Sequence, residues 1–152
     1  MDKSCCHTHI NEDEAKEILG ENGLNRTKVK TKVLLEISKA SKPISVAEIH
    51  QKFKNFNCDI STVFRTITQF KEKNIVQEVN LGEGFFRYEM INHDHKDHEH
   101  HHHHHVRCRN CGDIKLIEKC DISIFEKMIS KLGYTQTEHR LEFIGLCPKC
   151  SK

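Results

Sequence analysis

The sequence lacks long apolar segments, and this absence excludes two classes of protein. No apolar run approaches the roughly 18 residues that a membrane-spanning helix needs. The first residues, MDKSCCHTHINEDE, contain no apolar core of a secretory signal, so we expect a cytoplasmic protein without a membrane partner. Hydrophobic residues make up only 36% of the 152 residues, which is little for one self-sufficient core. Two small modules, one stabilised by metal or by dimerisation, fit this composition better.

Motifs typical of enzymes are also missing. The sequence contains neither a recognisable Ser-His-Asp arrangement nor a Gly-rich phosphate loop. A dithiol oxidoreductase places its Cys-x-x-Cys at the start of a helix in a βαβ setting. Both Cys-x-x-Cys pairs of this chain flank predicted strands instead, so we expect no enzymatic activity.

Charge is distributed unevenly along the chain, although the formal net charge is only +2. Residues 1–23 carry six acidic and two basic side chains, whereas residues 24–73 carry eleven basic and four acidic ones. Residues 74–152 are nearly balanced, with eleven basic and twelve acidic side chains. A basic segment of this kind indicates a surface that meets nucleic-acid phosphate, with an ordinary solvated helical face as the alternative.

The first half of the chain predicts a winged helix-turn-helix. Apolar spacing, capping residues and terminal glycines indicate four helices. We expect them over residues 12–22, from Thr27 to near Pro43, over 46–54, where a capping box from Ser45 to Glu48 opens the helix, and over 61–73. The last two, joined by a short polar turn, form a helix-turn-helix candidate. Strands over 75–81 and 85–90 around a Gly-Glu-Gly turn predict a hairpin, which in this position is a wing.

The second half predicts a small α/β module after a histidine-rich linker. Short strands are expected at 106–108 and 114–118, and a further strand within 135–146. Between them, a capping box from Ser123 to Glu126 opens a helix that Gly133 closes. The chain is therefore predicted to be α+β. Its expected parts are a flexible tail (1–11), a DNA-binding domain (12–91), a hinge (92–105) and a dimerisation and zinc-binding domain (106–152).

Eight cysteines in a cytoplasmic chain indicate metal binding in preference to disulfides. Cys108 and Cys111 form one Cys-x-x-Cys pair, and Cys147 and Cys150 form a second. Two such knuckles beside strands predict a closed, tetrahedral and structural zinc site with four thiolate ligands. Another tetrathiolate metal or a reduced dithiol remains open from spacing alone.

Six consecutive histidines, His100–His105, precede the first knuckle. In a strand His103 and His105 point to one face and His102 and His104 to the other, so this segment is able to supply two metal sites. Imidazole suits zinc, iron, copper and nickel, so the ligand type does not name the ion. The N-terminal cluster of Cys5, Cys6, His7 and His9 is either a soft-metal site or a tail. Cys58 is expected as a small buried hydrophobe, and the role of Cys120 stays open.

Several motifs together resemble the ferric-uptake-regulator family, which includes iron, zinc, manganese and peroxide sensors. They are LNRT from Leu24, SVAEI from Ser45, ISTVFRTI from Ile60, VNLGEG from Val79, RYE from Arg87, the His run with CxxCG, and HRLEFIGLCPKC from His139. The resemblance covers residues 15–150. It implies a homodimeric repressor whose winged helix reads an AT-rich inverted repeat in double-stranded DNA, and whose hinge metal sets the two reading heads.

The resemblance also implies ligand sets. Cys108, Cys111, Cys147 and Cys150 match the structural zinc ligands. Glu89, His103 and His105 match members of the regulatory hinge site, which would hold Zn²⁺ or Fe²⁺. His102, His104 and His139 match members of a second site in the dimerisation half, where Asp121 is the acid nearest the family's position and Glu118 or Cys120 are substitutes. The chain departs from the pattern at Lys42, Leu116 and Ile122, where family members carry ligands, and at Phe64, which replaces a tyrosine.

The resemblance and the basic segment together predict the DNA contacts. The recognition helix would lie in the major groove, with Ser61, Thr62, Phe64 and Arg65 nearest the bases and phosphates. Lys28, Lys30 and Arg87 would add phosphate contacts. The function expected is repression of metal-homeostasis genes, with zinc uptake slightly favoured over iron uptake. A peroxide- or manganese-responsive regulator and a His/Cys-rich metal buffer are the alternatives.

Overall fold

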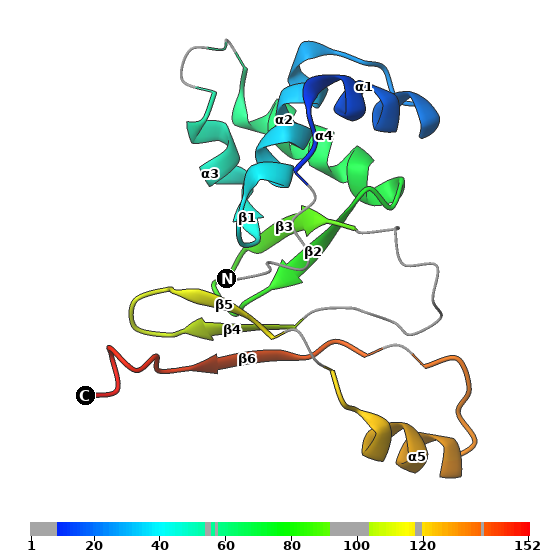
Figure 1. Ribbon diagram of the computed structural model, residues 1–152, viewed down its shortest axis with the longest axis vertical. Helices are drawn as coiled ribbons and strands as arrows, with labels where there is room; N and C mark the ends of the chain where they lie inside the picture. Colours follow the sequence, from blue (N-terminus) through cyan, green and yellow to red (C-terminus); the bar gives the residue numbers. More distant parts are fainter. Residues whose placement is uncertain (1–8, 54–55, 57, 92–103, 118–119, 138) are drawn as a thin grey trace. The chain divides into compact units, whose positions relative to one another are not determined.

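The computed structural model describes residues 9–53, 56, 58–91, 104–117, 120–137 and 139–152. They belong to two compact units, Met1–Asp94 and His95–Lys152, which are described one at a time (Figure 1). Each unit combines helical and strand segments, which confirms the predicted α+β class. Every helix among the described residues is too short or too polar to cross a lipid bilayer.

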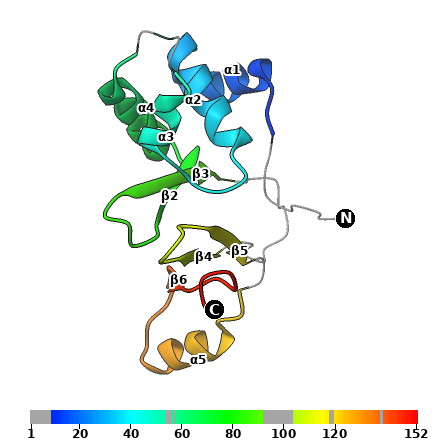
Figure 2. The ribbon, with the colours of Figure 1, turned by 90° about the vertical axis from the view of Figure 1, so that its left-hand side faces the viewer.

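The described residues of unit 1 form four helices on one side of a small antiparallel sheet (Figures 1 and 2). Its elements are α1 (Glu12–Glu21), α2 (Lys28–Lys39), β1 (Ile44–Ser45), α3 (Val46–Gln51), α4 (Ile60–Glu72), β2 (Val76–Asn80) and β3 (Phe86–Met90). Ser45 begins α3 with the predicted capping box: its hydroxyl accepts from the Glu48 amide, and Glu48 accepts from the Ser45 amide. Thr27 caps α2, as the sequence indicated.

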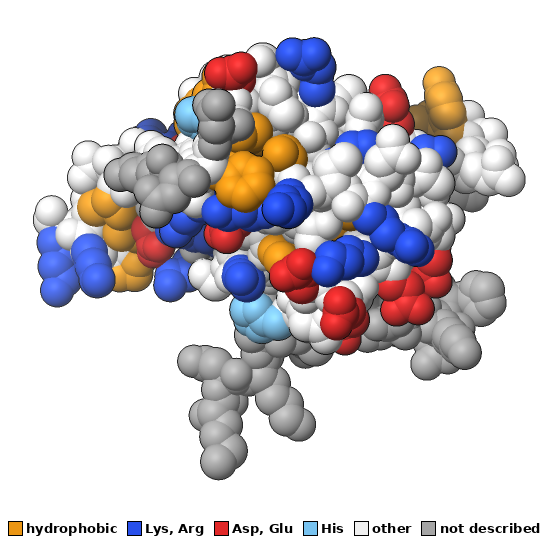
Figure 3. Space-filling model, turned by 90° about the horizontal axis from the view of Figure 1, so that it is seen from above, with side chains coloured by type: hydrophobic (Ala, Val, Ile, Leu, Met, Phe, Trp, Pro, Cys, Tyr) orange, Lys and Arg blue, Asp and Glu red, His pale blue; other side chains and the backbone are white. Residues whose placement is uncertain are grey.

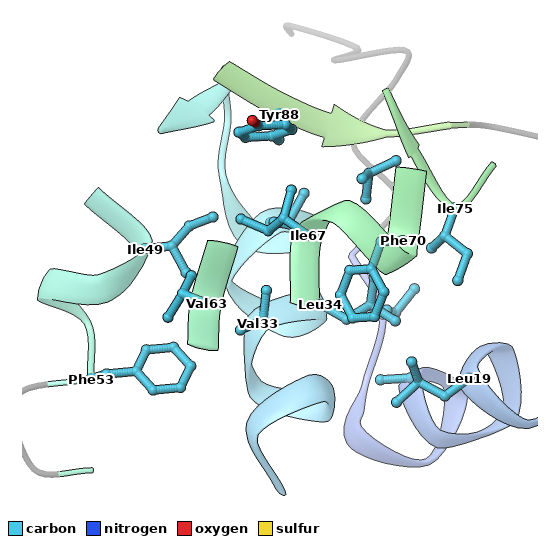
Figure 4. Close-up of a cluster of buried hydrophobic side chains, with 14 residues drawn as sticks. Leu19, Val33, Leu34, Ile49, Phe53, Val63, Ile67, Phe70, Ile75 and Tyr88 are labelled. Carbon is cyan, nitrogen blue, oxygen red and sulfur yellow. The ribbon is translucent and has the colours of Figure 1, made fainter. Parts of the chain in front are cut away.

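The core of unit 1 is formed by apolar side chains at helical spacing on α2 and α4 (Figure 4). Val33 and Leu34 of α2 and Val63 and Phe70 of α4 are fully buried. Because these positions recur every three to four residues, each helix buries one stripe and leaves the opposite face in water. Tyr88, from the sheet, covers the same core. The packing therefore fixes which face of α4 remains outside.

The wing has one strand more than the sequence predicted. β1, with only two residues, pairs antiparallel with β3, and the sheet order is β1-β3-β2. A two-residue strand has no detectable alternation, so no sequence pattern marks it. The β2–β3 hairpin turns through Gly82 and Gly84, both with positive φ (67° and 80°), which glycine adopts without steric cost.

The described residues of unit 2 form a three-stranded sheet and one helix. Its elements are β4 (His104–Cys108), β5 (Ile114–Ile117), α5 (Ser123–Lys131) and β6 (Glu142–Gly145). β4 is the central strand; it pairs antiparallel with β5 and parallel with β6. The expected strand within 135–146 is thus confined to four residues. The predicted capping box at Ser123 is wrong: α5 begins after Ile122, and Ser123 instead donates from its amide and hydroxyl to the Asp121 carboxylate.

Candidate metal centres and nucleic-acid interface

The parallel pairing of β4 with β6 brings the two cysteine knuckles together. Cys108 ends β4 and lies opposite Gly145 at the end of β6, two residues before Cys147. Because both strands run in the same direction, the segments that follow them emerge at the same edge of the sheet. Gly112 has φ +72° and its amide donates to the Cys108 carbonyl over 2.9 Å, which closes the first knuckle.

The four sulfurs of Cys108, Cys111, Cys147 and Cys150 lie within 4.8 Å of one another. Those of Cys111 and Cys147 are 3.7 Å apart. A tetrahedral zinc with Zn–S bonds of about 2.3 Å requires sulfur separations of about 3.8 Å. The donor set is therefore spaced for one zinc ion, and the cluster fits a structural zinc site.

Local amides prepare this site for thiolate. The amides of Cys111 and Cys147 donate to Cys108, in the second case over 3.3 Å, and they lower the pKa of Cys108 to about 6. A thiol with that pKa is ionised at neutral pH, and thiolate is the form that binds metal. The backbone of the two knuckles thus stabilises negative charge where the metal would bind.

A second cluster lies at the opposite end of the same strands. His104 begins β4, and His139 precedes β6 by three residues. His139 Nε2 lies 3.3 Å from His104 Nε2 and 3.2 Å from Cys120 Sγ, and the three ligand atoms fall within 4.8 Å of one another. With about 3.3 Å per residue, the length of β4 separates this cluster from the cysteine knuckles by about 13 Å.

The His104 ring is held with Nε2 directed at this cluster. Its Nδ1 lies 3.0 Å from the Leu141 carbonyl oxygen, which is able only to accept, so Nδ1 carries the proton and Nε2 presents its lone pair to the cluster. Burial lowers the pKa of His104, and the neighbouring His139 and His105 act in the same direction, although the bond to Leu141 opposes them. The ring is therefore neutral at pH 7, as a metal ligand must be.

The third residue of the cluster differs from the expected one. Asp121 was predicted as the acidic ligand, but its carboxylate bonds Ser123 at the start of α5 and Asp121 is not part of the cluster. Its neighbour Cys120 occupies that place. His102 and Glu118 lie outside the described residues. Of the predicted second site, the structure thus brings together His104 and His139.

The predicted hinge site involves both units. Glu89 is part of β3 in unit 1, where it accepts a hydrogen bond of 2.7 Å from Gln77. His105 is a buried residue of β4 in unit 2, and His103 lies outside the described residues. A common site for these three residues stays a prediction.

The outer face of α4 carries the residues predicted to read DNA. Ser61, Phe64 and Arg65 are exposed and Thr62 is half-buried. The Phe64 ring is 55% exposed, although this aromatic side chain follows the buried Val63. A large apolar ring kept in water on the second helix of a helix-turn-helix is suited to contact a thymine methyl group.

The two lysines predicted to contact phosphate lie at the start of α2. Lys28, at the first position of α2, is exposed, and Lys30 is half-buried. On the face that Figure 3 presents, Lys and Arg side chains alternate with Asp and Glu.

Arg87 does not occupy the position expected of a DNA contact. Arg87 is only 8% exposed. The guanidinium donates to both Glu83 carboxylate oxygens (2.5 and 3.1 Å), to Glu48 (2.8 Å) and to the Pro43 carbonyl (3.2 Å). The prediction of a phosphate contact is corrected accordingly, because these partners already take up the guanidinium. Arg87 ties the wing to the start of α3.

Unit 2 exposes an apolar surface that the sequence analysis did not single out. α5 buries none of its residues, and it stands apart from the three strands in Figures 1 and 2. Met128 and Leu132 of the helical segment are 58% and 74% exposed, and Ile144 of the edge strand β6 is 52% exposed. An amphipathic spacing from Phe125 to Leu132 marked this helix, and only the structure shows that its apolar side finds no cover within the described unit.

Comparisons with known proteins agree with this arrangement. A model of the "Ferric uptake regulator family" matches residues 21–144. The chain is 34% identical over 146 residues to a ferric uptake regulation protein of Staphylococcus epidermidis, covering 94% of this chain and 99% of that protein. It is 27% identical over 144 residues to the peroxide operon regulator of Bacillus subtilis, covering 91% and 92%. The solved structure of the Vibrio cholerae ferric uptake regulator has a TM-score of 0.69 at 27% identity, covering 87% of this chain and 98% of that one.

Proposed function

This chain belongs to the ferric uptake regulator family and is a metal-responsive transcriptional regulator. From that premise we propose that it represses genes of metal uptake, with zinc uptake slightly favoured over iron uptake. The observation that carries the proposal is the exposed face of α4 in a winged helix, in the same chain as two metal-ligand clusters. A metal buffer has no use for such a helix. An enzyme of this size would need a catalytic constellation, which the sequence does not offer.

Operator recognition is assigned to α4. Ser61 and Arg65 would bond base edges and phosphate, and Phe64 would pack on thymine methyl groups. Lys28 and Lys30 add phosphate contacts, which set affinity and salt dependence. Thymine contacts are consistent with an AT-rich operator, and two copies of the chain would read the halves of an inverted repeat.

The homodimer is assigned to unit 2. Apolar side chains of α5 and of the edge strand β6 lie exposed, among them Met128, Leu132 and Ile144. A second copy covers both features at once, because a two-fold interface uses the same surface from each chain. The structural zinc maintains β6 beside β4 and thereby preserves this surface.

Sensing is assigned to an exchangeable ion that favours the DNA-competent arrangement. Glu89, His103 and His105 would provide the hinge ligands, and His104 and His139 those of the second site. An ion changes DNA affinity only if it binds one arrangement of the protein more tightly than the other. Ligands supplied by both units meet this condition, since their spacing depends on the arrangement.

The test measures operator binding with and without the exchangeable metal. Protein that retains one zinc per chain at the four cysteines is titrated onto a labelled AT-rich inverted repeat and onto a scrambled duplex of equal composition, in the presence of Zn²⁺, Fe²⁺, Mn²⁺ or none. We expect zinc to raise affinity for the inverted repeat at least about tenfold, a coupling of the usual allosteric size. Equal affinity in all four conditions contradicts the proposal.

Two variants separate specific recognition from general charge. Phe64→Ala should lower affinity for the inverted repeat by about five- to a hundredfold, the usual range for one base-pair contact, and leave scrambled-duplex binding unchanged. Lys131→Met, at the end of α5, removes one positive charge outside the proposed DNA contacts and should leave both affinities unchanged. If Lys131→Met weakens binding as much as Phe64→Ala, α4 is not the reading helix.

A further inference from the structure

The cluster of His104, Cys120 and His139 combines nitrogen and sulfur donors, and this mixture bears on which metal ions it binds. Two of its ligand atoms are imidazole nitrogens and the third is a sulfur, all within 4.8 Å. Iron(II) and manganese(II) prefer oxygen and nitrogen donors, whereas thiolate favours zinc and copper(I). The acidic residue next in the chain, Asp121, bonds Ser123 instead.

We propose that Cys120 is the ligand that makes this cluster a zinc site and makes it selective for zinc over iron(II) and manganese(II). The inference deepens the proposed function, on which it rests for its regulatory meaning, by naming the metal that the second site accepts. The ligand set itself is measurable without DNA.

The distances within the cluster agree with a shared ion. In a tetrahedral zinc site with Zn–N of about 2.05 Å and Zn–S of about 2.3 Å, nitrogens lie about 3.3 Å apart and sulfur lies about 3.6 Å from nitrogen. The observed separations are 3.3 Å from His139 Nε2 to His104 Nε2 and 3.2 Å from His139 Nε2 to Cys120 Sγ. A small outward shift of the thiol would bring the sulfur–nitrogen separation to the tetrahedral value.

The surroundings also orient the ligands. The Leu141 carbonyl fixes the His104 tautomer, which leaves Nε2 as a lone-pair donor inside the cluster. His104 is buried and the other two residues are half-buried, so the site is shielded from water but reachable by an ion. A hydrogen-bonded trio without metal is the competing arrangement, because a thiol and two imidazoles also satisfy one another.

The experiment uses cobalt(II) as a spectroscopic substitute for zinc. The full chain carries Cys5→Ser and Cys6→Ser, so that the N-terminal thiols add no signal, and retains one zinc at the four cysteines by elemental analysis. Cobalt(II) is then titrated and the near-ultraviolet thiolate-to-cobalt charge-transfer band is recorded. We expect this band in the parent and its loss in Cys120→Ser. Cys58→Ser, a half-buried thiol of unit 1, is the matched control and should keep the band.

Selectivity is measured by competition with a chromophoric chelator. Cys120→Ser should lower zinc affinity at least about tenfold, since even residues behind the ligands have effects of that size. Cys120→Asp, which restores an oxygen donor, should lower the ratio of zinc to manganese affinity by at least about tenfold. Retention of the first zinc and an unchanged circular dichroism spectrum show that the variants are folded.

Two results overturn the inference: no thiolate band in the parent protein, or an unchanged zinc-to-manganese ratio in Cys120→Asp. The proposed function fails separately. If the band and the zinc preference persist while no metal alters operator affinity, regulation is wrong and the ligand assignment stands. If operator binding responds to metal but Cys120→Ser retains the parent's band and affinity, only the present inference is lost.

Discussion

Replacement of Arg87 by methionine tests whether this residue is structural or contacts DNA. Arg87→Met keeps most of the apolar stem and removes the guanidinium, which makes four hydrogen bonds to Glu83, Glu48 and Pro43. The Glu83 side chain is only 13% exposed, so its carboxylate loses its partner where water replaces it poorly. The Glu48 side chain is 44% exposed, and solvent compensates most of that loss. We expect unfolding free energy to fall by about 2–4 kcal/mol, mainly through Glu83.

The assay is urea denaturation of zinc-loaded protein followed by circular dichroism, together with the salt dependence of DNA binding. Arg65→Met is the comparison, because Arg65 is exposed on α4 and its guanidinium makes only a long bond of 3.4 Å to the Ser61 carbonyl. Arg65→Met should change stability by less than about 0.5 kcal/mol and reduce the salt slope by about one unit. Arg87→Met should lower the stability and leave the salt slope unchanged. A stable Arg87→Met protein with a reduced salt slope would refute the structural role and restore the phosphate contact.

Three further predictions concern the first cysteine knuckle, the stability at acid pH and the dimer. Gly112→Ala places a side chain at φ +72° with no atom within 4 Å, so the cost of about 1–2 kcal/mol comes from the backbone alone and should appear as weaker zinc retention against a chelator. Burial acts to raise the pKa of Glu48, but bonds from Ser45 and Arg87 outweigh it and keep that pKa below 4.5. The stability that results is present above pH 4.5 and is lost as the pH falls through the pKa of the folded state. Glu48→Gln should therefore weaken the fall of the thermal unfolding temperature at acid pH. Leu132→Glu, at a position 74% exposed, should give monomers by light scattering with zinc content unchanged, and a persisting dimer would exclude α5 from the interface.

The sequence predicted features whose determinants are local or repeated. Capping at Ser45 depends on residues three positions apart, and the structure has it as expected. The alternation of buried and exposed positions on α4 follows from helical period alone. The four knuckle cysteines were predicted to meet because two identical pairs beside strands imply a common ion, and their sulfurs do lie together.

Features that depend on long-range contacts escaped the sequence. Arg87 was expected at the DNA because it lies in a wing, and nothing in the local sequence indicates that Glu48, 39 residues earlier, takes up its charge. The choice between Asp121 and Cys120 as ligand depends on how the chain enters α5, where a single residue changes which side chain faces His139. Both cases require the path of the backbone, which composition and spacing do not contain.

The two clusters at opposite ends of β4 and β6 impose an order of loading. His139 meets His104 only while β6 lies along β4, and an ion at the four cysteines would hold the far end of those two strands together. We therefore expect a newly made chain without that first ion to lack a formed second site. Zinc depletion severe enough to keep the four cysteines empty would leave the protein inactive. Milder depletion would empty only the second site and leave a folded protein that is able to respond to metal.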